Sequence, residues 1–289
     1  MASTTNVPYY ATDLPSRLPT ESEIHKAPDI SLEYGGRRVV EIKPHFVVKF
    51  GKGVNLIEGE NMMFVGENTS IRVPRVYALY TKSDTGEKYI IMERIVGQSL
   101  LSSWSRLGPL ERESITTTLH HYFTELRSLS PPSYYGSLGK RCLLDEIFWT
   151  QSPEPAINGP FDSNECLIEA MAKKYTHDGG SHYRADFYRQ CLPRVLCDHR
   201  PTFTHGDFQR KNVIIQMKEV NSSDPDSAEL QVVILDWEKS GWYPGYWEYC
   251  LAICALRWDN DWCLWIERVL KPFVSEASWL QTIRLELWS

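Results

Sequence analysis

The chain has 289 residues, 42% hydrophobic and 12% aromatic, a composition that predicts a packed globular protein and argues against disorder. Its net charge is −6; residues 1–100 hold twelve basic and twelve acidic residues, so the remaining residues, with nineteen basic and 25 acidic, carry the whole excess. No basic face for nucleic acid is therefore expected, and the acidic part weakly favours a cationic partner.

The first hundred residues predict an arm followed by a sheet. Residues 1–30 are polar and contain four prolines, which is typical of a loose or wrapping arm. Gly35-Gly36 indicates a turn into a strand, and Phe46–Gly51 reads as the next strand. Lys49 lies inside that second apolar run, where an ammonium without a partner would be costly. The residues alone leave open whether Lys49 binds an anion or reaches solvent along its flexible stem.

A helix and two further strands are predicted next. Residues 56–67 indicate a helix that carries Glu58 and Glu60, which cannot share a helix face because they are two residues apart. Residues 73–95 read as two strands joined by an Asp- and Gly-containing hairpin turn. Residues 31–95 are therefore expected to form a small antiparallel sheet with one helix.

From residue 96 onward the pattern is mostly helical. The longest predicted helix covers residues 110–129, where apolar residues recur at helical spacing, and Pro131-Pro132 ends it. A proline-containing loop is expected at residues 150–163. The other predicted helices cover residues 164–175, 182–196, 246–258, 262–269 and 276–288.

The most informative motif is His205-Gly206-Asp207, followed five residues later by Asn212. A polar hairpin loop and the apolar run Leu230–Leu235 then lead to Asp236. Two strands joined by a hairpin would bring Asn212 and Asp236 close together. An aspartate could then hold a substrate hydroxyl while the other two side chains hold a metal. Phosphoryl transfer needs this combination of positioning and charge neutralisation.

Because Asp236 is followed by Trp237-Glu238, the complete pattern resembles the aminoglycoside phosphotransferase and choline kinase-like family, distant relatives of protein kinases. The likeness covers about residues 35 to 258. The stretches Gly241–Pro244 and Tyr246–Glu248 look most similar to fungal members.

The resemblance implies an α+β, bilobal, protein-kinase-like fold. It places a small antiparallel-sheet N-lobe at residues 31–95 and a mostly helical C-lobe at residues 96–289, after an N-terminal arm at residues 1–30.

The resemblance also implies a nucleotide site. Lys49 would contact the α- and β-phosphates of ATP, and a helix glutamate would hold it in place. The family pattern favours Glu58 for that role and leaves Glu60 open. Met92 would line the adenine pocket, and backbone groups between Glu93 and Ile95 would bind the adenine edge. The nucleotide-binding set is then Lys49, Glu58, Met92, Glu93 and Ile95.

The remaining site residues follow from the same resemblance. Asp207 would be the catalytic residue that accepts or orients the proton of the acceptor. Asn212 and Asp236 would bind Mg²⁺, since oxygen ligands suit a hard cation.

Two departures from protein kinases stand in the sequence. No Gly-x-Gly-x-x-Gly segment precedes Lys49, and the lysine that protein kinases carry two residues after the catalytic aspartate is Gln209 here. Arg210 or Lys211 could neutralise the transferred charge instead, or either could face solvent.

The sequence therefore predicts an ATP- and Mg²⁺-dependent phosphotransferase that acts on the hydroxyl group of a small molecule. Acidic and aromatic side chains would suit an ammonium-bearing acceptor. The alternative is a nucleotide-binding pseudokinase or regulatory module without turnover, while a protein kinase would need His-Arg-Asp and Ala-Pro-Glu motifs. The sequence does not decide whether ATP or GTP is the phosphoryl donor, nor what the oligomeric state is. The acceptor-side candidates are Glu238, Asp259, Asp261, Trp242 and Trp247.

The chain is also expected to be cytoplasmic and to bind no membrane. No apolar run reaches membrane-spanning length, and the first residues lack a secretory signal. Seven scattered cysteines without Cys-x-x-Cys spacing argue against a zinc site. Cys250 and Cys254 read as buried thiols in a reducing compartment.

Overall fold

The computed structural model describes residues 7–31, 35–197, 199–219, 228–258 and 260–287. Contacts divide these residues into two compact units. The sheet unit comprises residues 3–103 and 213–238, and the helical unit comprises residues 104–212 and 239–289. The chain thus leaves the sheet unit after Ser103 and returns to it for Val213–Glu238. An antiparallel-sheet part and a mostly helical part are the α+β architecture that the sequence predicts.

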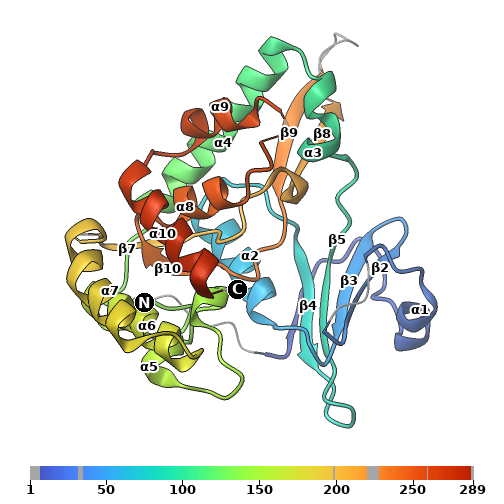
Figure 1. The fold of residues 1–289 in the computed structure, drawn as a ribbon. Helices are drawn as coiled ribbons and strands as arrows, with labels where there is room; N and C mark the ends of the chain where they lie inside the picture. The colour runs from blue at the N-terminus through green and yellow to red at the C-terminus, as the bar shows by residue number, and fades with distance from the viewer. Residues whose placement is uncertain (1–6, 32–34, 198, 220–227, 259, 288–289) are drawn as a thin grey trace. The chain divides into compact units, whose positions relative to one another are not determined.

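The sheet unit contains a five-stranded antiparallel sheet with the order β1-β4-β5-β3-β2. Figure 1 shows its strands β4, β5, β3 and β2. A second, three-stranded sheet has the order β6-β8-β9. The strands of this unit are β1 (Tyr9–Tyr10), β2 (Arg37–Ile42), β3 (Phe46–Gly51), β4 (Val76–Thr81), β5 (Lys88–Glu93), β6 (Gln98–Ser99), β8 (Val213–Glu219) and β9 (Ala228–Ile234). Its helices are α1 (Glu21–Lys26), α2 (Ile57–Asn68) and α3 (Leu100–Ser103).

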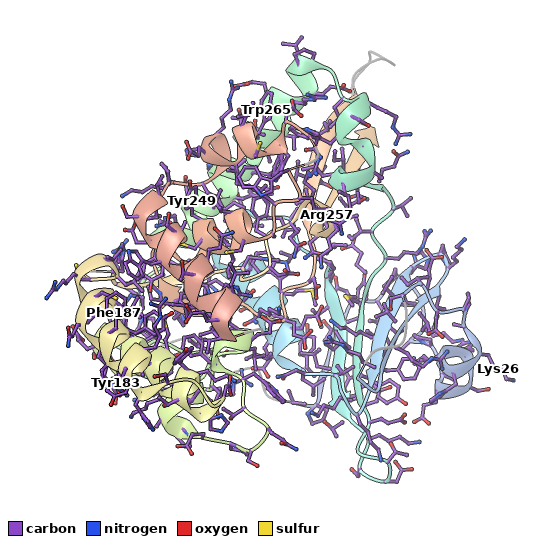
Figure 2. The ribbon with its side chains drawn as sticks, viewed as in Figure 1. Lys26, Tyr183, Phe187, Tyr249, Arg257 and Trp265 are labelled. Atoms are coloured by element: carbon purple, nitrogen blue, oxygen red, sulfur yellow. The ribbon has the colours of Figure 1, made fainter. Side chains whose placement is uncertain are left out.

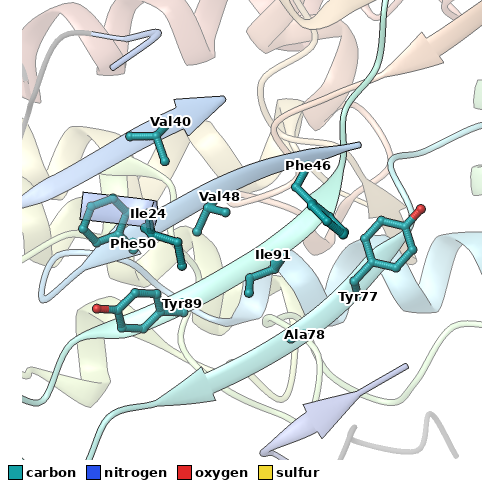
Figure 3. Close-up of a cluster of buried hydrophobic side chains, with 9 residues drawn as sticks. All are labelled: Ile24, Val40, Phe46, Val48, Phe50, Tyr77, Ala78, Tyr89 and Ile91. Carbon is teal, nitrogen blue, oxygen red and sulfur yellow. The ribbon is translucent and has the colours of Figure 1, made fainter. Parts of the chain in front are cut away.

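Side-chain alternation along β3 determines which residues enter the core of the sheet unit. Phe46, Val48 and Phe50 are all buried in one hydrophobic cluster with residues of α1, β2, β4 and β5 (Figure 3). Because successive residues of a strand point to opposite faces, Lys49 points away from that cluster. The apolar sequence around Lys49 therefore forms a core on one face and leaves the lysine on the other.

The N-terminal arm wraps onto the sheet from residue 7 onward. Tyr9 and Tyr10 pair with Leu79 and Ala78 at the edge of the sheet. The helix α1 begins with a capping box, in which Thr20 and Glu23 bind each other's backbone N–H groups. Its Ile24 is fully buried in the cluster of Figure 3. The described part of the arm is thus attached to the sheet unit through β1 and α1.

A glycine allows α2 to pack closely on the sheet. A Cβ atom on Gly59 would lie 2.2 Å from Cδ2 of Leu79 on β4, far inside van der Waals contact. The close approach positions the preceding residue, Glu58, which is 3% exposed.

The helical unit is built on the long helix α4 (Pro109–Ser128), which begins at a proline and buries Ile115, Leu119, Phe123 and Leu126. A two-stranded antiparallel pair lies in the same unit, formed by β7 (Pro201–Thr204) and β10 (Gly241–Pro244). The other helices are η1 (Trp104–Arg106), η2 (Glu146–Phe148), α5 (Pro155–Asn158), α6 (Asn164–His177), α7 (His182–Val195), η3 (Arg210–Asn212), α8 (Trp247–Cys254), α9 (Trp262–Val269) and α10 (Val274–Leu287).

The predicted helix over residues 246–258 is wrong in its length. The observed α8 ends at Cys254, and Trp258 has a left-handed φ of 57°, which an α-helix cannot contain. The strand β10 was not predicted, and the expected loop at residues 150–163 contains the single turn α5.

All seven cysteines are free thiols. Cys250 is completely buried, as the sequence predicts, whereas the same prediction is wrong for Cys254, which is only partly buried near the end of α8. Within the described ranges, every helix is too short or too polar to cross a lipid bilayer.

Candidate active site

Lys49 is the centre of a charged cluster in the sheet unit. Its Nζ lies 2.5 Å from Oε2 of Glu58 and 3.5 Å from Oδ1 of Asp236. Oε2 of Glu238 also lies 3.5 Å away. The side chains of Lys49 and Glu58 are only 10% and 4% exposed. Of the two helix glutamates left open by the sequence, Glu58 therefore forms the ion pair with the strand lysine.

The electrostatics keep this lysine charged. Burial opposes the charge, but the carboxylates of Glu58, Asp236 and Glu238 outweigh it and raise the pKa of Lys49 above its ordinary value. Lys49 is therefore charged, and its carboxylate partners fix the position of its ammonium group.

Asp236 reaches this cluster through an uncommon backbone conformation. Its φ is +64°, in the left-handed region that favours glycine. The next residue, Trp237, is fully buried; its Nε1 donates to the Ile234 carbonyl at 2.9 Å, and its own carbonyl accepts from Asn61 Nδ2 at 2.8 Å. These contacts hold the backbone of Trp237, directly after Asp236, in place. Strained residues held by their surroundings are frequent at functional sites.

The same cluster offers oxygen atoms to a cation. Carboxylate oxygens of Glu58, Asp236 and Glu238 lie within 4.8 Å of one another. Arg37, at the start of β2, donates to Oε2 of Glu238 at 2.6 Å. Glu238 is therefore held by two basic residues of its own unit.

The predicted adenine-binding segment lies at the end of β5. Met92 is 8% exposed and pairs with Val47 of β3, so it belongs to the core edge of the sheet. The N–H of Glu93 donates to the Arg75 carbonyl at 2.8 Å, and its carboxylate binds Arg72. The N–H of Arg94 likewise donates to the His45 carbonyl at 2.8 Å, so a backbone N–H donor for an adenine edge would come from Ile95 or beyond, while carbonyl groups before it could still accept.

The loop that carries His205-Gly206-Asp207 lies in the helical unit, between β7 and η3. Both oxygens of Asp207 accept hydrogen bonds: Oδ1 from Gln209 Nε2 at 2.5 Å, and Oδ2 from Asn212 Nδ2 at 2.9 Å. Asn212 Nδ2 also donates to the Asp207 carbonyl at 2.9 Å. The motif spacing thus brings the aspartate and the asparagine into direct contact within one loop.

Buried polar contacts fix the backbone of this loop. The N–H of Asp207 donates to Nδ1 of the fully buried His205 at 3.2 Å, which gives His205 a supporting role. Ser240 Oγ donates to the His205 carbonyl at 2.9 Å. Gly206 has a φ of +83°, and a Cβ there would lie 2.7 Å from the Lys239 carbonyl oxygen, so the position accepts only glycine.

A buried glutamate of α8 completes this support. Glu248 is 3% exposed, and its Oε2 accepts the N–H of His205 at 2.6 Å. Burial raises the pKa of Glu248 to about 7, even though hydrogen bonds from the backbone of His205 and Gly206 favour the charged form.

The two basic residues of the loop have different surroundings. Arg210 is buried, with its guanidinium 5.7 Å from the ring centre of Trp262. Lys211 is half exposed, and its Nζ lies 3.5 Å from Oδ2 of Asp207. Lys211 is therefore the loop cation near the Asp207 carboxylate, whereas Arg210 packs against Trp262.

The acceptor-side candidates are mostly engaged in packing. Trp242 and Trp247 are 2% and 0% exposed, so neither ring is open to a ligand. Asp261 Oδ1 accepts from Trp104 Nε1 at 2.8 Å, and its Oδ2 accepts from Arg112 at 2.8 Å. Its Oδ2 also accepts from Nε1 of Trp265, the α9 residue labelled in Figure 2. Asp261 thus fixes the start of α9, and Asp259 lies outside the described residues.

Sequence reasoning missed the supporting roles of Glu248, Gln209 and Arg37. For Glu248 a signal was present, because a lone acid inside the apolar run Trp247–Cys254 must be buried with a partner. The hydrogen bond between Arg37 and Glu238 could not be predicted from local sequence, because the two residues are 201 positions apart.

Several solved structures that resemble this chain are aminoglycoside phosphotransferases. A streptomycin–ATP ternary complex of APH(2")-IIa has a TM-score of 0.59 and 15% identity, covering 94% of this chain and 92% of that one. The GDP complex of wild-type aminoglycoside 2'-phosphotransferase-IIIa has a TM-score of 0.56 and 13% identity, covering 92% and 86%. Aminoglycoside phosphotransferase APH(4)-Ia has a TM-score of 0.52 and 13% identity, covering 91% and 82%. At such identities the likeness establishes the protein-kinase-like fold.

A search of curated protein sequences found no match. The profile of the phosphotransferase enzyme family matches residues 58–271, which include Glu58, the loop from His205 to Asn212, and Asp236. This match covers about three quarters of the chain, which therefore belongs to the phosphotransferase enzyme family.

Proposed function

We propose that this protein transfers the γ-phosphoryl group of ATP to a hydroxyl group of a small molecule. The observation that carries the proposal is the buried Lys49, held 2.5 Å from Glu58 and 3.5 Å from Asp236. A lysine paired with a helix glutamate beside a metal-binding aspartate is the arrangement that kinases use for nucleotide phosphates. Family membership and the nucleotide complexes of the similar structures support it.

The nucleotide would bind to the sheet unit. Lys49 would contact the α- and β-phosphates, and Glu58 would keep its ammonium in place. Met92 would line the pocket of the base, and backbone groups from Glu93 to Ile95 would bind its edge. One similar structure contains ATP and another contains GDP, so an assay with both nucleotides is needed to decide whether this protein uses ATP or GTP.

Asp236 and Asn212 would hold Mg²⁺. The donor set fits a hard cation, because the Asp236 carboxylate lies with the oxygens of Glu58 and Glu238 within 4.8 Å. Asn212 uses its amide nitrogen to bind Asp207, and a metal would take its amide oxygen, so the two contacts are compatible. When bound, the ion neutralises phosphate charge.

Asp207 would accept or orient the proton of the acceptor hydroxyl. Its carboxylate is held on both oxygens, and its side chain is 19% exposed, so a substrate can still reach it. Lys211 would supply positive charge beside that carboxylate.

For the acceptor we favour an ammonium-bearing alcohol, on the acidic excess of residues 101–289. The likeness to fungal members and a cytoplasmic location stay predictions from the sequence.

The test measures nucleotide consumption with Mg²⁺, using ATP and, separately, GTP. Wild type and Asp207→Ala are compared against pooled aminoglycosides, choline-like amines, amino alcohols and sugars. We expect turnover that one pool stimulates and that Asp207→Ala abolishes. Nucleotide binding without stimulated turnover from any pool would instead favour a pseudokinase.

A further inference from the structure

Gln209 occupies the position at which protein kinases carry a lysine, and in this chain it binds the catalytic carboxylate directly. Its Nε2 donates to Oδ1 of Asp207 at 2.5 Å. An amide can approach so closely only with its nitrogen, because its oxygen would face another acceptor. Hydrogen bonds to an ionised group are shorter and stronger than neutral ones.

The neighbours of Gln209 keep its backbone in place. Phe208 is buried, with its ring centre 4.5 Å from that of Phe123 on α4. Arg210 is buried over the ring of Trp262 on α9. Because Phe208 and Arg210 are both packed in place, the backbone of Gln209 between them is fixed. Only the side-chain torsions of Gln209 are then left to be ordered when it binds the Asp207 carboxylate.

The two oxygens of Asp207 are not equivalent. Oδ2 faces two donors, Asn212 Nδ2 at 2.9 Å and Lys211 Nζ at 3.5 Å. Among the residues that the structure describes, Gln209 Nε2 is the side-chain donor at Oδ1. A carboxylate oxygen can accept about two hydrogen bonds, so Oδ1 keeps the capacity for one more.

We infer that Gln209 is a positioning residue, which holds the Asp207 carboxylate so that Oδ1 receives the proton of the acceptor hydroxyl. In this step the hydroxyl oxygen forms a bond to the γ-phosphorus, the bond to the leaving nucleoside diphosphate breaks, and the hydroxyl proton passes to Oδ1. The inference rests on the proposed function for its catalytic part. Its structural part, that Gln209 fixes the carboxylate, stands independently.

The test uses two substitutions at this position and two matched controls. Gln209→Met keeps the length of the side chain and removes the donor, while Gln209→Glu keeps its shape and places an acceptor against Oδ1. Gln281→Met and Gln281→Glu make the same changes on the exposed face of α10. Thermal unfolding of all four variants shows whether any effect comes from a loss of folding.

Two readouts are expected to change together at position 209. In crystals of Gln209→Met, the Asp207 carboxylate adopts a different orientation from that in wild-type crystals. With the acceptor pool that stimulates wild type, kcat falls about 10- to 100-fold in Gln209→Met and further in Gln209→Glu, the order of a general-base contribution. The KM for ATP stays at its wild-type value in both variants, and the melting temperature stays at its wild-type value in Gln209→Met. The Gln281 variants behave as wild type.

An unchanged carboxylate in Gln209→Met crystals would overturn the inference, and so would an unchanged kcat in an active enzyme. If wild type shows no acceptor-stimulated turnover, the proposed function fails and the crystals alone decide whether Gln209 positions Asp207. A kcat that falls equally in the Gln281 variants would also overturn it, because the effect would then not belong to this position.

Discussion

The buried carboxyl of Glu248 should make the stability of the protein fall as pH rises. It lies in α8, 3% exposed, and accepts the His205 N–H at 2.6 Å. Its Oε1 has no hydrogen-bond partner among the described residues. Burial raises the pKa from its ordinary value of 4.5 to about 7.

The magnitude and the sign follow from proton linkage. A pKa difference of one unit between the folded and the unfolded chain changes the free energy of unfolding by about 1.36 kcal/mol. The rise of the Glu248 pKa from 4.5 to about 7 therefore corresponds to about 3 kcal/mol. Below pH 4.5 the carboxyl is protonated in the folded and the unfolded chain, and its stabilising contribution is complete. As pH rises to about 7 the unfolded chain releases the proton and the folded chain keeps it, so that contribution is lost.

The assay compares wild type with Glu248→Gln by urea unfolding between pH 5 and pH 8.5. The glutamine is neutral throughout and can still accept the His205 N–H. Over this range the free energy of unfolding of Glu248→Gln should rise relative to wild type by about 2–3 kcal/mol. Other titrating groups are common to both proteins and cancel in the difference. A difference that stays constant with pH would refute the reasoning.

Three further substitutions test other parts of the structure. Lys49→Met leaves Glu58 buried without its cation and should lower the free energy of unfolding by about 3–5 kcal/mol. Adding Glu58→Gln should recover part of that loss in urea unfolding, and no recovery would contradict the pairing. Gly59→Ala places a Cβ 2.2 Å from Leu79, and the overpacking, about 1–3 kcal/mol, should outweigh the gain of about 1 kcal/mol in helix propensity. A higher melting temperature of Gly59→Ala than of wild type would contradict this overpacking argument. Asp261→Asn weakens the contacts to Trp104 and Arg112, so it should cost about 1–2 kcal/mol of stability and leave the acceptor KM unchanged. A raised KM at normal stability would return Asp261 to the acceptor site.

Local patterns were sufficient for most elements of the fold. The apolar run Phe46–Gly51 predicted β3 with its observed bounds, and five of its six residues are buried. The helix Trp262–Val269 was also predicted with its observed bounds, since its apolar residues recur at helical spacing. The end of α8 was predicted wrongly, because apolar residues continue in the sequence past Cys254 although the backbone leaves the helix there.

For the site, the sequence could name residues but not their partners. The spacing of Asp207 and Asn212 implied a shared loop, and their side chains are hydrogen-bonded. The contact of Glu248 with His205 spans 43 residues, and no local rule predicts such a pair. Asp261 was placed near a cation because it is acidic and close to tryptophans, whereas the structure uses the tryptophan N–H groups as its donors.

The interrupted sheet unit has a consequence for synthesis on the ribosome. Its strands β8 and β9 and the Trp237 carbonyl that binds Asn61 belong to Val213–Glu238, and Glu238 comes 135 residues after Ser103. At about 5–20 residues per second, the ribosome needs about 7 to 27 s to supply them. Throughout that interval the nascent sheet unit lacks its second sheet, and it can reach its final stability only after the first part of the helical unit has emerged.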